Sequence, residues 1–108
     1  MMNVVLIGED EELLSALEAE GASVQRIEGV ASGQALTEAG IEGADLLVLT
    51  DVAEATAIPV ARELNGAVRI AVYAEDTLPE FAQPLADIAV DPNLLSPDVV
   101  AEELVGNG

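Results

Sequence analysis

The chain has 108 residues, enough for one domain that buries its own core without a metal or a disulfide. It contains no cysteine and no histidine, which excludes thiolate nucleophiles, sulfur-ligated metals and histidine general bases. Against 21 acidic residues it has three arginines and no lysine, and this formal net charge of −18 excludes the basic patches that bind nucleic acid and disfavours anionic membranes.

The acidic surplus also predicts the solution conditions that the folded chain needs. Like charges at this density repel one another in a compact domain, whereas 1 M salt shortens the screening length to about 3 Å. About half of the residues (51%) are apolar, which contradicts a disordered chain. No apolar run approaches the roughly 20 residues of a membrane span, and the N-terminus lacks a signal-peptide pattern. We therefore expect a folded, salt-adapted cytoplasmic protein from an extreme halophile.

The first third of the chain predicts a strand, a helix and a second strand. Residues 3–8 form a continuous apolar run that ends at a glycine, which is typical of a strand buried on both faces. Residues 11–20 carry leucines at helical spacing and acids in the first turn, and Gly21 ends the helix. Residues 22–28 alternate apolar and polar side chains, as a strand at a sheet edge does.

The middle of the chain predicts two helices around another buried strand. Residues 32–39 favour a short helix that ends at Gly40, and the apolar run over residues 45–50 favours the strand. Residues 52–64 place apolar side chains along one helical face, although Pro59 should bend this helix or delay its start.

The last third predicts two strands, each followed by a helix. Residues 68–74 and 87–90 favour the strands, and residues 78–85 favour a helix with a proline near each end. Residues 97–104 favour the final helix, with Ser96 as its N-cap and a proline at its first position.

Strands that alternate with helices at this spacing predict a single α/β domain over residues 1–108, a Rossmann-like three-layer sandwich. Its five-stranded parallel sheet should have the order 2-1-3-4-5, with helices on both faces. In such sheets ligands bind beyond the carboxyl ends of the strands, where the first and third strands are neighbours. The candidate binding residues at this place are Gly8, Asp10, Glu28, Thr50 and Asp51. No residue is predicted to be catalytic or to bind a metal.

Short phrases in the middle and at the end of the chain resemble those of a known family. The phrases are EAGIE (38–42), AD (44–45), LTD (49–51), ARELN (61–65) and DPNLL (91–95). Their order is similar to that in the N-terminal nucleotide-binding domain of regulators of potassium conductance, the TrkA-N family. The resemblance implies a Rossmann-like fold that pairs with a second copy, a nucleotide crevice, and an acid at Glu28 that contacts a ribose.

The loop after the first strand departs from that family. The family's G-x-G-x-x-G motif needs three positions without side chains, and this chain keeps only Gly8, with Asp10 and Leu13 at the other two. A carboxylate about 5 Å from a phosphate costs about 3 kcal/mol at an effective dielectric of about 20, and salt screens much of this repulsion. Salt cannot remove the bulk of the side chains, so we expect no dinucleotide or other cofactor.

The remaining candidates each have a structural alternative. For Glu28 the alternative to a ribose contact is an ordinary exposed acid, which we favour because acids are so numerous in this chain. Thr50 and Asp51 match the Thr-Asp pair of the TrkA-N family, and the N-cap of the following helix is an equal alternative for them.

A phospho-acceptor receiver domain is a second hypothesis, because it shares the 2-1-3-4-5 order. A receiver needs an acid pair after the first strand to hold magnesium and an aspartate after the third strand to accept the phosphoryl group. Glu9 and Asp10 are close to the first requirement and Asp51 to the second, with Thr77 after the fourth strand. Asp51 lies one residue late, however, and Asp91 precedes a proline where a Lys-Pro pair is expected. We rank this hypothesis below the first.

A third hypothesis is an enzyme of nucleotide metabolism resembling CTP synthetase. Such an enzyme needs a lysine-containing phosphate loop and a nucleophilic cysteine, and the chain has neither residue type. We therefore expect no enzyme but a stand-alone, degenerate TrkA-N-like domain, acting as a non-catalytic regulatory or scaffold module. A nucleotide sensor for NAD, ATP or AMP is the alternative. The expected partner is a second copy or another cytoplasmic protein, without nucleic acid or membrane insertion.

Overall fold

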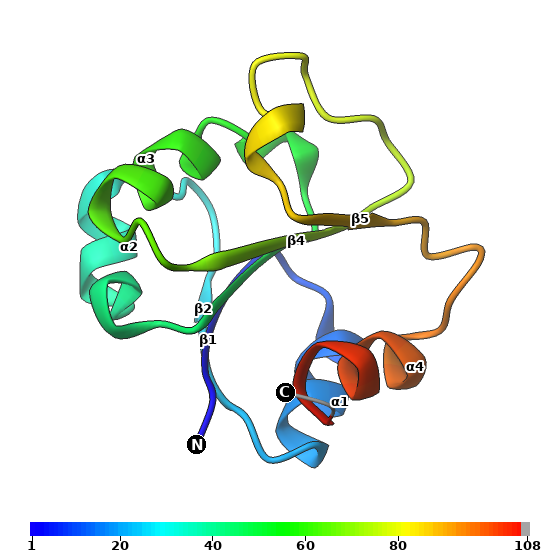
Figure 1. Ribbon diagram of the computed structural model, residues 1–108. Coiled ribbons are helices and arrows are strands. Elements are labelled where there is room, and N and C mark those ends of the chain that lie inside the picture. The colour runs from blue at the N-terminus through cyan, green and yellow to red at the C-terminus, as the bar shows by residue number, and fades with distance from the viewer. Residues whose placement is uncertain (107–108) are drawn as a thin grey trace.

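The computed structural model describes residues 1–106 and contains one parallel five-stranded sheet in the order β2-β1-β3-β4-β5 (Figure 1). The predicted fold class and strand order are therefore confirmed. The strands are β1 (Asn3–Ile7), β2 (Ser23–Ile27), β3 (Leu46–Leu49), β4 (Arg69–Tyr73) and β5 (Ile88–Val90). The helices are α1 (Glu11–Ala19), α2 (Gly33–Glu38), α3 (Ala57–Leu64) and α4 (Pro97–Ala101). Shorter turns are 3-10 at Ile41–Gly43, Val52–Glu54 and Gln83–Leu85, and π-helical at Glu102–Gly106.

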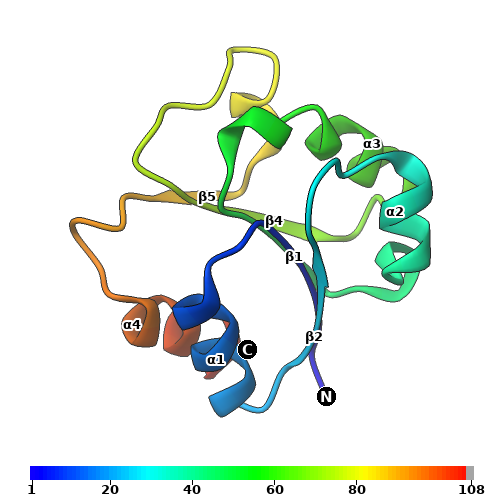
Figure 2. The same ribbon diagram turned by 180° about the vertical axis from the view of Figure 1, so that it is seen from behind.

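The helices cover both faces of the sheet, with α1 and α4 on one face and α2 and α3 on the other (Figures 1 and 2). Successive strand residues point to opposite faces, so Val5 and Leu47 pack under α2 and α3 while Val4 and Leu46 pack under α1 and α4. Every residue of β3 is buried, which explains its continuous apolar run. Apart from Tyr73, no residue with a polar or charged side chain among residues 1–106 is buried, and none of the helices in that range has the length and apolarity to cross a membrane.

The predicted helix over residues 52–64 is divided in two, because its first part forms a 3-10 turn and α3 begins only at Ala57. Pro59 is then the third residue of α3, within the first turn, where a backbone N–H has no partner inside the helix. The prediction that Pro59 delays the helix is confirmed. Ser96 also caps α4 as predicted, with its hydroxyl accepting the N–H of Val99 at 3.4 Å.

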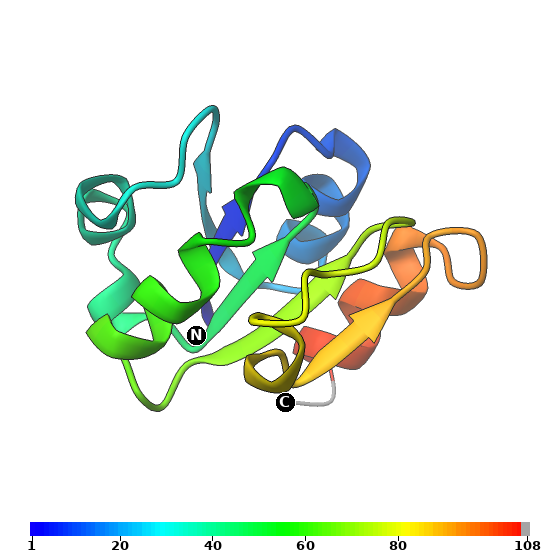
Figure 3. The same cartoon turned by 90° about the horizontal axis from the view of Figure 1, so that it is seen from above.

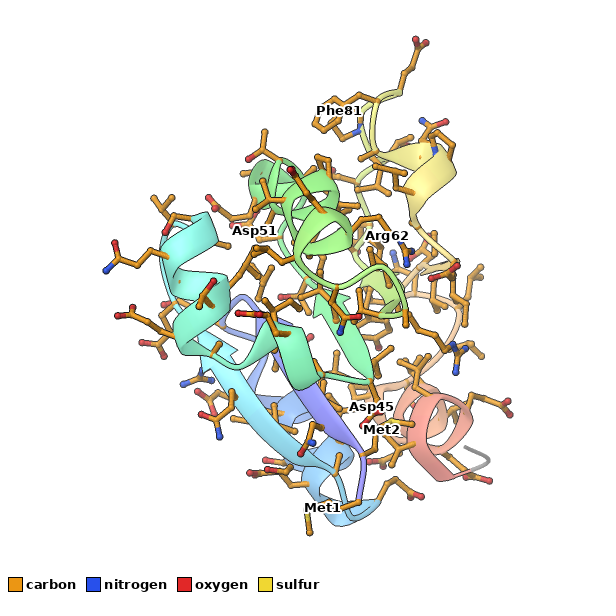
Figure 4. All side chains as sticks on the ribbon, turned by 60° about the vertical axis from the view of Figure 1, so that its left-hand side comes forward. Met1, Met2, Asp45, Asp51, Arg62 and Phe81 are labelled. Atoms are coloured by element: carbon orange, nitrogen blue, oxygen red, sulfur yellow. The ribbon has the colours of Figure 1, made fainter. Side chains whose placement is uncertain are left out.

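The predicted helix over residues 78–85 is wrong, since only a 3-10 turn forms between β4 and β5, at Gln83–Leu85. Pro79 and Pro84 each lack the N–H that a longer helix would use, so the rest of this connection is a loop. Phe81 projects from the loop with 51% of its surface exposed (Figure 4).

Arg62 of α3 holds this loop and the start of β5 against the body of the domain (Figure 4). Its guanidinium donates to the carbonyl oxygen of Val68 at 2.6 Å and to that of Leu85 at 3.0 Å. It also lies 3.3 Å from a carboxylate oxygen of Asp87, which in turn accepts the N–H of Ile70 at 2.8 Å. One side chain therefore connects α3, β4 and β5 where a helix is missing.

Tyr73, the only tyrosine in the chain, connects β4 to the segment before α4. Its side chain is buried, with 3% exposed, and its hydroxyl donates to the carbonyl oxygen of Leu95 at 2.7 Å. Burial raises the pKa of Tyr73, and the negative charges of Asp10 and Glu12 raise it further.

Candidate functional site

The carboxyl ends of β1 and β3 border a hollow of about 330 Å³ at the place where the sequence predicts ligand binding. We call this hollow the crevice. Its walls come from three connections of the fold and are formed by Ile7, Gly8, Glu9, Gly29, Val30, Asp51 and Glu54. Of the five predicted binding residues, the structure thus brings Gly8 and Asp51 to the crevice, while Asp10, Glu28 and Thr50 are not among its lining residues.

Thr50 directs its side chain to the backbone of β1. Its Oγ1 donates to the carbonyl oxygen of Ile7 at 2.9 Å, and its N–H donates to the same oxygen at 3.0 Å. Gly8 follows Ile7 with a φ of +124°, a conformation that side chains disfavour. The glycine and the threonine therefore have structural roles at the paired ends of β1 and β3.

Both aspartates of the predicted site cap helical turns. Asp10 is the N-cap of α1, and its carboxylate accepts the N–H of Leu13 at 3.0 Å. Asp51 is the N-cap of the Val52–Glu54 turn, and its carboxylate accepts the N–H of Ala53 at 3.0 Å. Each carboxylate thus satisfies one of the free amides of a helix start, as the N-cap alternative describes.

Glu28 takes part in a surface ion-pair network on β2. One of its carboxylate oxygens lies 2.6 Å from the guanidinium of Arg26, which also pairs with Glu11 at the start of α1. The hydrogen bond that Arg26 donates to Glu11, with the charges of Glu11 and Glu28, raises the pKa of Arg26. The carboxylate of Glu28 is 59% exposed, so the pair contributes little to stability.

Glu54 is not one of the five candidate binding residues, but it belongs to the segment 50–54 that the strand order places beside the crevice, and it lines the crevice as expected. It accepts the backbone N–H of Ala31 at 2.8 Å and so connects the turn after β3 to the loop after β2. Its bond to Ala31 could not be predicted from the sequence, because the contact joins residues that are far apart in the chain.

The residues at the crevice do not fit the magnesium ion of a receiver domain. Within residues 1–106, no three acidic side chains are grouped so that they could hold a metal ion. Asp10 and Asp51 each use one carboxylate oxygen to accept a backbone N–H. The chain also has no lysine to contact a phosphoryl group. Glu9, Asp51 and Glu54 line the crevice, but these three described residues do not form a group that could share one ion.

Residues 4–104 match the model of a family of unknown function, DUF7126. The chain belongs to this family. No curated protein matches the DUF7126 chain.

Solved structures similar to this DUF7126 chain include response regulators. An orphan response regulator of H. pylori is 19% identical with a TM-score of 0.73, and the match covers 95% of this chain and 92% of that one. A CheY-like receiver domain from Methanospirillum hungatei is 16% identical with a TM-score of 0.71, covering 99% and 93%. An atypical orphan response regulator is 19% identical with a TM-score of 0.70, covering 94% and 91%. At these identities the likeness shows the fold, which is receiver-like.

The resemblance of this DUF7126 chain to the TrkA-N family is wrong. The family match is to DUF7126, and the similar solved structures include response regulators and a CheY-like receiver domain. The quoted phrases mark strand ends and helix ends, such as Thr50 and Asp51 after β3 and Asn65 after α3. Any parallel α/β domain needs capping and turn residues at these places, so the phrases reflect the fold and do not identify the family.

Proposed function

We propose that this chain is a non-catalytic regulatory or scaffold module with a receiver-like fold, which works through contacts with other proteins and without phosphoryl transfer. The observation that carries the proposal is the use of the acids around the crevice as backbone acceptors. Asp10, Asp51 and Glu54 each accept a main-chain N–H, so these side chains stabilise loops and helix starts.

Phosphoryl transfer to an aspartate finds little support in the geometry. The residue that follows β3 is Thr50, whose hydroxyl donates a hydrogen bond to the carbonyl oxygen of Ile7. The carboxylate of Asp51, one residue later, caps the next helical turn. One of the structurally similar proteins is described as an atypical orphan response regulator with a phosphorylation-independent regulatory mechanism. We propose the same independence from phosphate for this chain.

Nucleotide binding is disfavoured by the charge of the crevice. Glu9, Asp51 and Glu54 line it, so a phosphate placed there would face three carboxylates. In a dinucleotide-binding domain a pyrophosphate would lie at the start of α1. Here the carboxylate of Asp10 already accepts the N–H of Leu13, and two glutamates stand in the first turn. We accordingly propose that no nucleotide cofactor is used.

Thermal melting in about 2 M KCl, which screens the charge, tests the proposal. The protein is melted alone and with NAD, ATP, AMP or magnesium, and is incubated with magnesium and radiolabelled acetyl phosphate. A ligand at 100 times its dissociation constant would add about 2.7 kcal/mol and raise the midpoint clearly. We expect no rise and no label. A rise with a nucleotide would make the chain a sensor, and magnesium-dependent labelling that Asp51→Asn abolishes would make it a phospho-acceptor.

The composition supports a further part of the proposal, which is that the module works in the cytoplasm of a cell with molar internal salt. The support is the net charge of −18 with only three cationic side chains.

A further inference from the structure

A second hollow of about 400 Å³ lies beside β4 and β5 and shares no lining residue with the crevice. We call it the β5 groove. Its apolar lining comes from Val72, Ala74, Leu78, Ala86, Ala89 and Val90. The connection from β4 to β5 passes beside it as a loop because the predicted helix does not form. Ala89 pairs in register with Val72 and, with its small side chain, leaves the groove open at the strand itself.

The outer edge of β5 borders the same groove and is open. β5 is the last strand in the sheet order, and within residues 1–106 its only strand partner is β4 (Figure 3). Ala74 donates its N–H to the carbonyl oxygen of Val90 at 3.2 Å, and Val90 pairs in register with Tyr73, so the peptide groups of Val90 point toward β4. Peptide groups of neighbouring strand residues point to opposite sides, so those of Ala89 point away from β4. An unpaired edge of this kind is a template for another strand.

The charge around the groove selects the chemistry of a partner. Asp76 and Asp91 lie in its lining, which contains no cationic side chain. Two of the three arginines of the chain, Arg26 and Arg62, already have acidic partners in ion pairs. A second copy would bring the same net charge of −18, whereas a basic segment complements it.

We propose that the β5 groove binds an extended, basic segment of a partner protein, which adds to the sheet as a strand beside β5 and seats an aliphatic side chain next to Ala89. The inference rests on the proposed function, because it states the kind of partner that the regulatory module takes. Main-chain hydrogen bonds to the free edge, an apolar anchor in the groove and cationic residues near Asp76 and Asp91 would act together.

A synthetic peptide of alternating lysine and valine is the probe, since as a strand it has one apolar and one basic face. Two control peptides keep its length: in one serine replaces valine at unchanged charge, and in the other glutamate replaces lysine. Binding to the full chain is followed by amide NMR shifts and by hydrogen exchange in 0.5 and 2 M KCl. We expect shifts at residues 74–78 and 86–91 and slower exchange of the Ala89 amide, with the lysine-valine peptide only.

Ala89→Leu tests the groove, because the added side chain fills the space beside an exposed strand residue. We expect it to weaken binding by at least about tenfold. Ala67→Leu is the matched control, since Ala67 is also exposed but precedes β4, at the amino end of the sheet. It should leave the affinity unchanged, and circular dichroism confirms that both variants fold.

Three results would overturn the inference. The first is equal binding of the lysine-serine peptide, which shows attraction by charge alone, and the second is equal affinity of Ala89→Leu and the parent chain. The third is protection of the Ala89 amide by raising the protein concentration without peptide, which shows that a second copy occupies the edge. The proposed function fails separately, by a nucleotide shift or phosphate labelling at the crevice, whatever the peptides do.

Discussion

A Cβ atom on Gly8 would overlap with the hydroxyl oxygen of Thr50, because the two residues stand side by side at the carboxyl ends of β1 and β3. The hydroxyl is held there by its bond to the carbonyl oxygen of Ile7. The one glycine that survives from the expected phosphate-binding motif is therefore required by a neighbouring side chain and by its own φ of +124°.

Gly8→Ala should lower the free energy of unfolding by at least about 2 kcal/mol, because the variant combines an unfavourable φ with a steric overlap. Urea unfolding in 2 M KCl measures the loss. Thr50→Ala alone should cost about 1 kcal/mol through its lost hydrogen bond. Since it also removes the overlap, the double variant should be more stable than the sum of the two losses predicts. If the two losses in unfolding free energy were strictly additive, the side chain of Thr50 would not be the reason that position 8 needs a glycine.

Arg62→Lys should lower the free energy of unfolding by about 1–3 kcal/mol, because an ammonium group cannot reach Val68, Leu85 and Asp87 together. Exchange of the amides around β5 should become faster while those of β1 stay protected, and hydrogen exchange with mass spectrometry resolves the two regions. Arg69→Lys, at an exposed position on β4, is the control and should change neither quantity. Uniform loss of protection would contradict a local role for Arg62.

Tyr73 should make the fold sensitive to alkali. Its pKa is raised in the folded state, so the folded protein binds the phenolic proton more tightly than the unfolded chain does. Stability from this group is complete below the unfolded pKa of about 10 and is lost as the pH rises through the higher folded value. Urea unfolding at pH 8 to 11 should show the loss, and Tyr73→Phe should flatten it. An equal alkaline loss in that variant would assign the effect to other groups.

The salt requirement should decrease when exposed acids are neutralised. Glutamine is introduced together at four exposed positions without side-chain hydrogen bonds, Glu42, Glu63, Glu80 and Glu103. In 0.1 M KCl the melting midpoint should rise by about 4–8 °C for each kcal/mol of repulsion removed, and its increase between 0.1 and 2 M should become smaller. Four Ser, Thr or Gln substitutions to Ala at exposed sites are the control. An unchanged salt slope would contradict self-repulsion as the cause.

The sheet could be predicted because its strands are the simplest pattern in the chain. The buried runs of β1, β3 and β4 are continuous, and the residues between them are too many for hairpins, so a parallel order follows. The helix expected over residues 78–85 could not be corrected from spacing alone, since Leu78 and Ala82 are buried as a helix would bury them. Pro79 and Pro84 prevent this helix because each lacks a backbone N–H. The hydrogen bond from Arg62 to Leu85 supports the loop that forms in its place.

The place of the crevice could be predicted from the strand order, but the contacts within it could not. Thr50 bonds to Ile7 only because β1 and β3 are in register, and Glu54 reaches Ala31 only because two connections meet in space. The capping of Asp10 and Asp51 was visible as an alternative, because aspartate before a helical turn is a common N-cap. The family resemblance failed for a related reason, since its short phrases report turns that many α/β folds share.

The chain has no tryptophan and a single tyrosine, so its intrinsic emission comes almost entirely from Tyr73. The hydroxyl of Tyr73 donates a hydrogen bond to the carbonyl oxygen of Leu95, which links β4 to the segment before α4. Its emission therefore reports one contact at one end of the sheet. Far-ultraviolet dichroism reports all the helices and strands at once. Because the two signals view such different parts of the molecule, their coincidence during unfolding would be a stringent test that the domain unfolds in a single cooperative step.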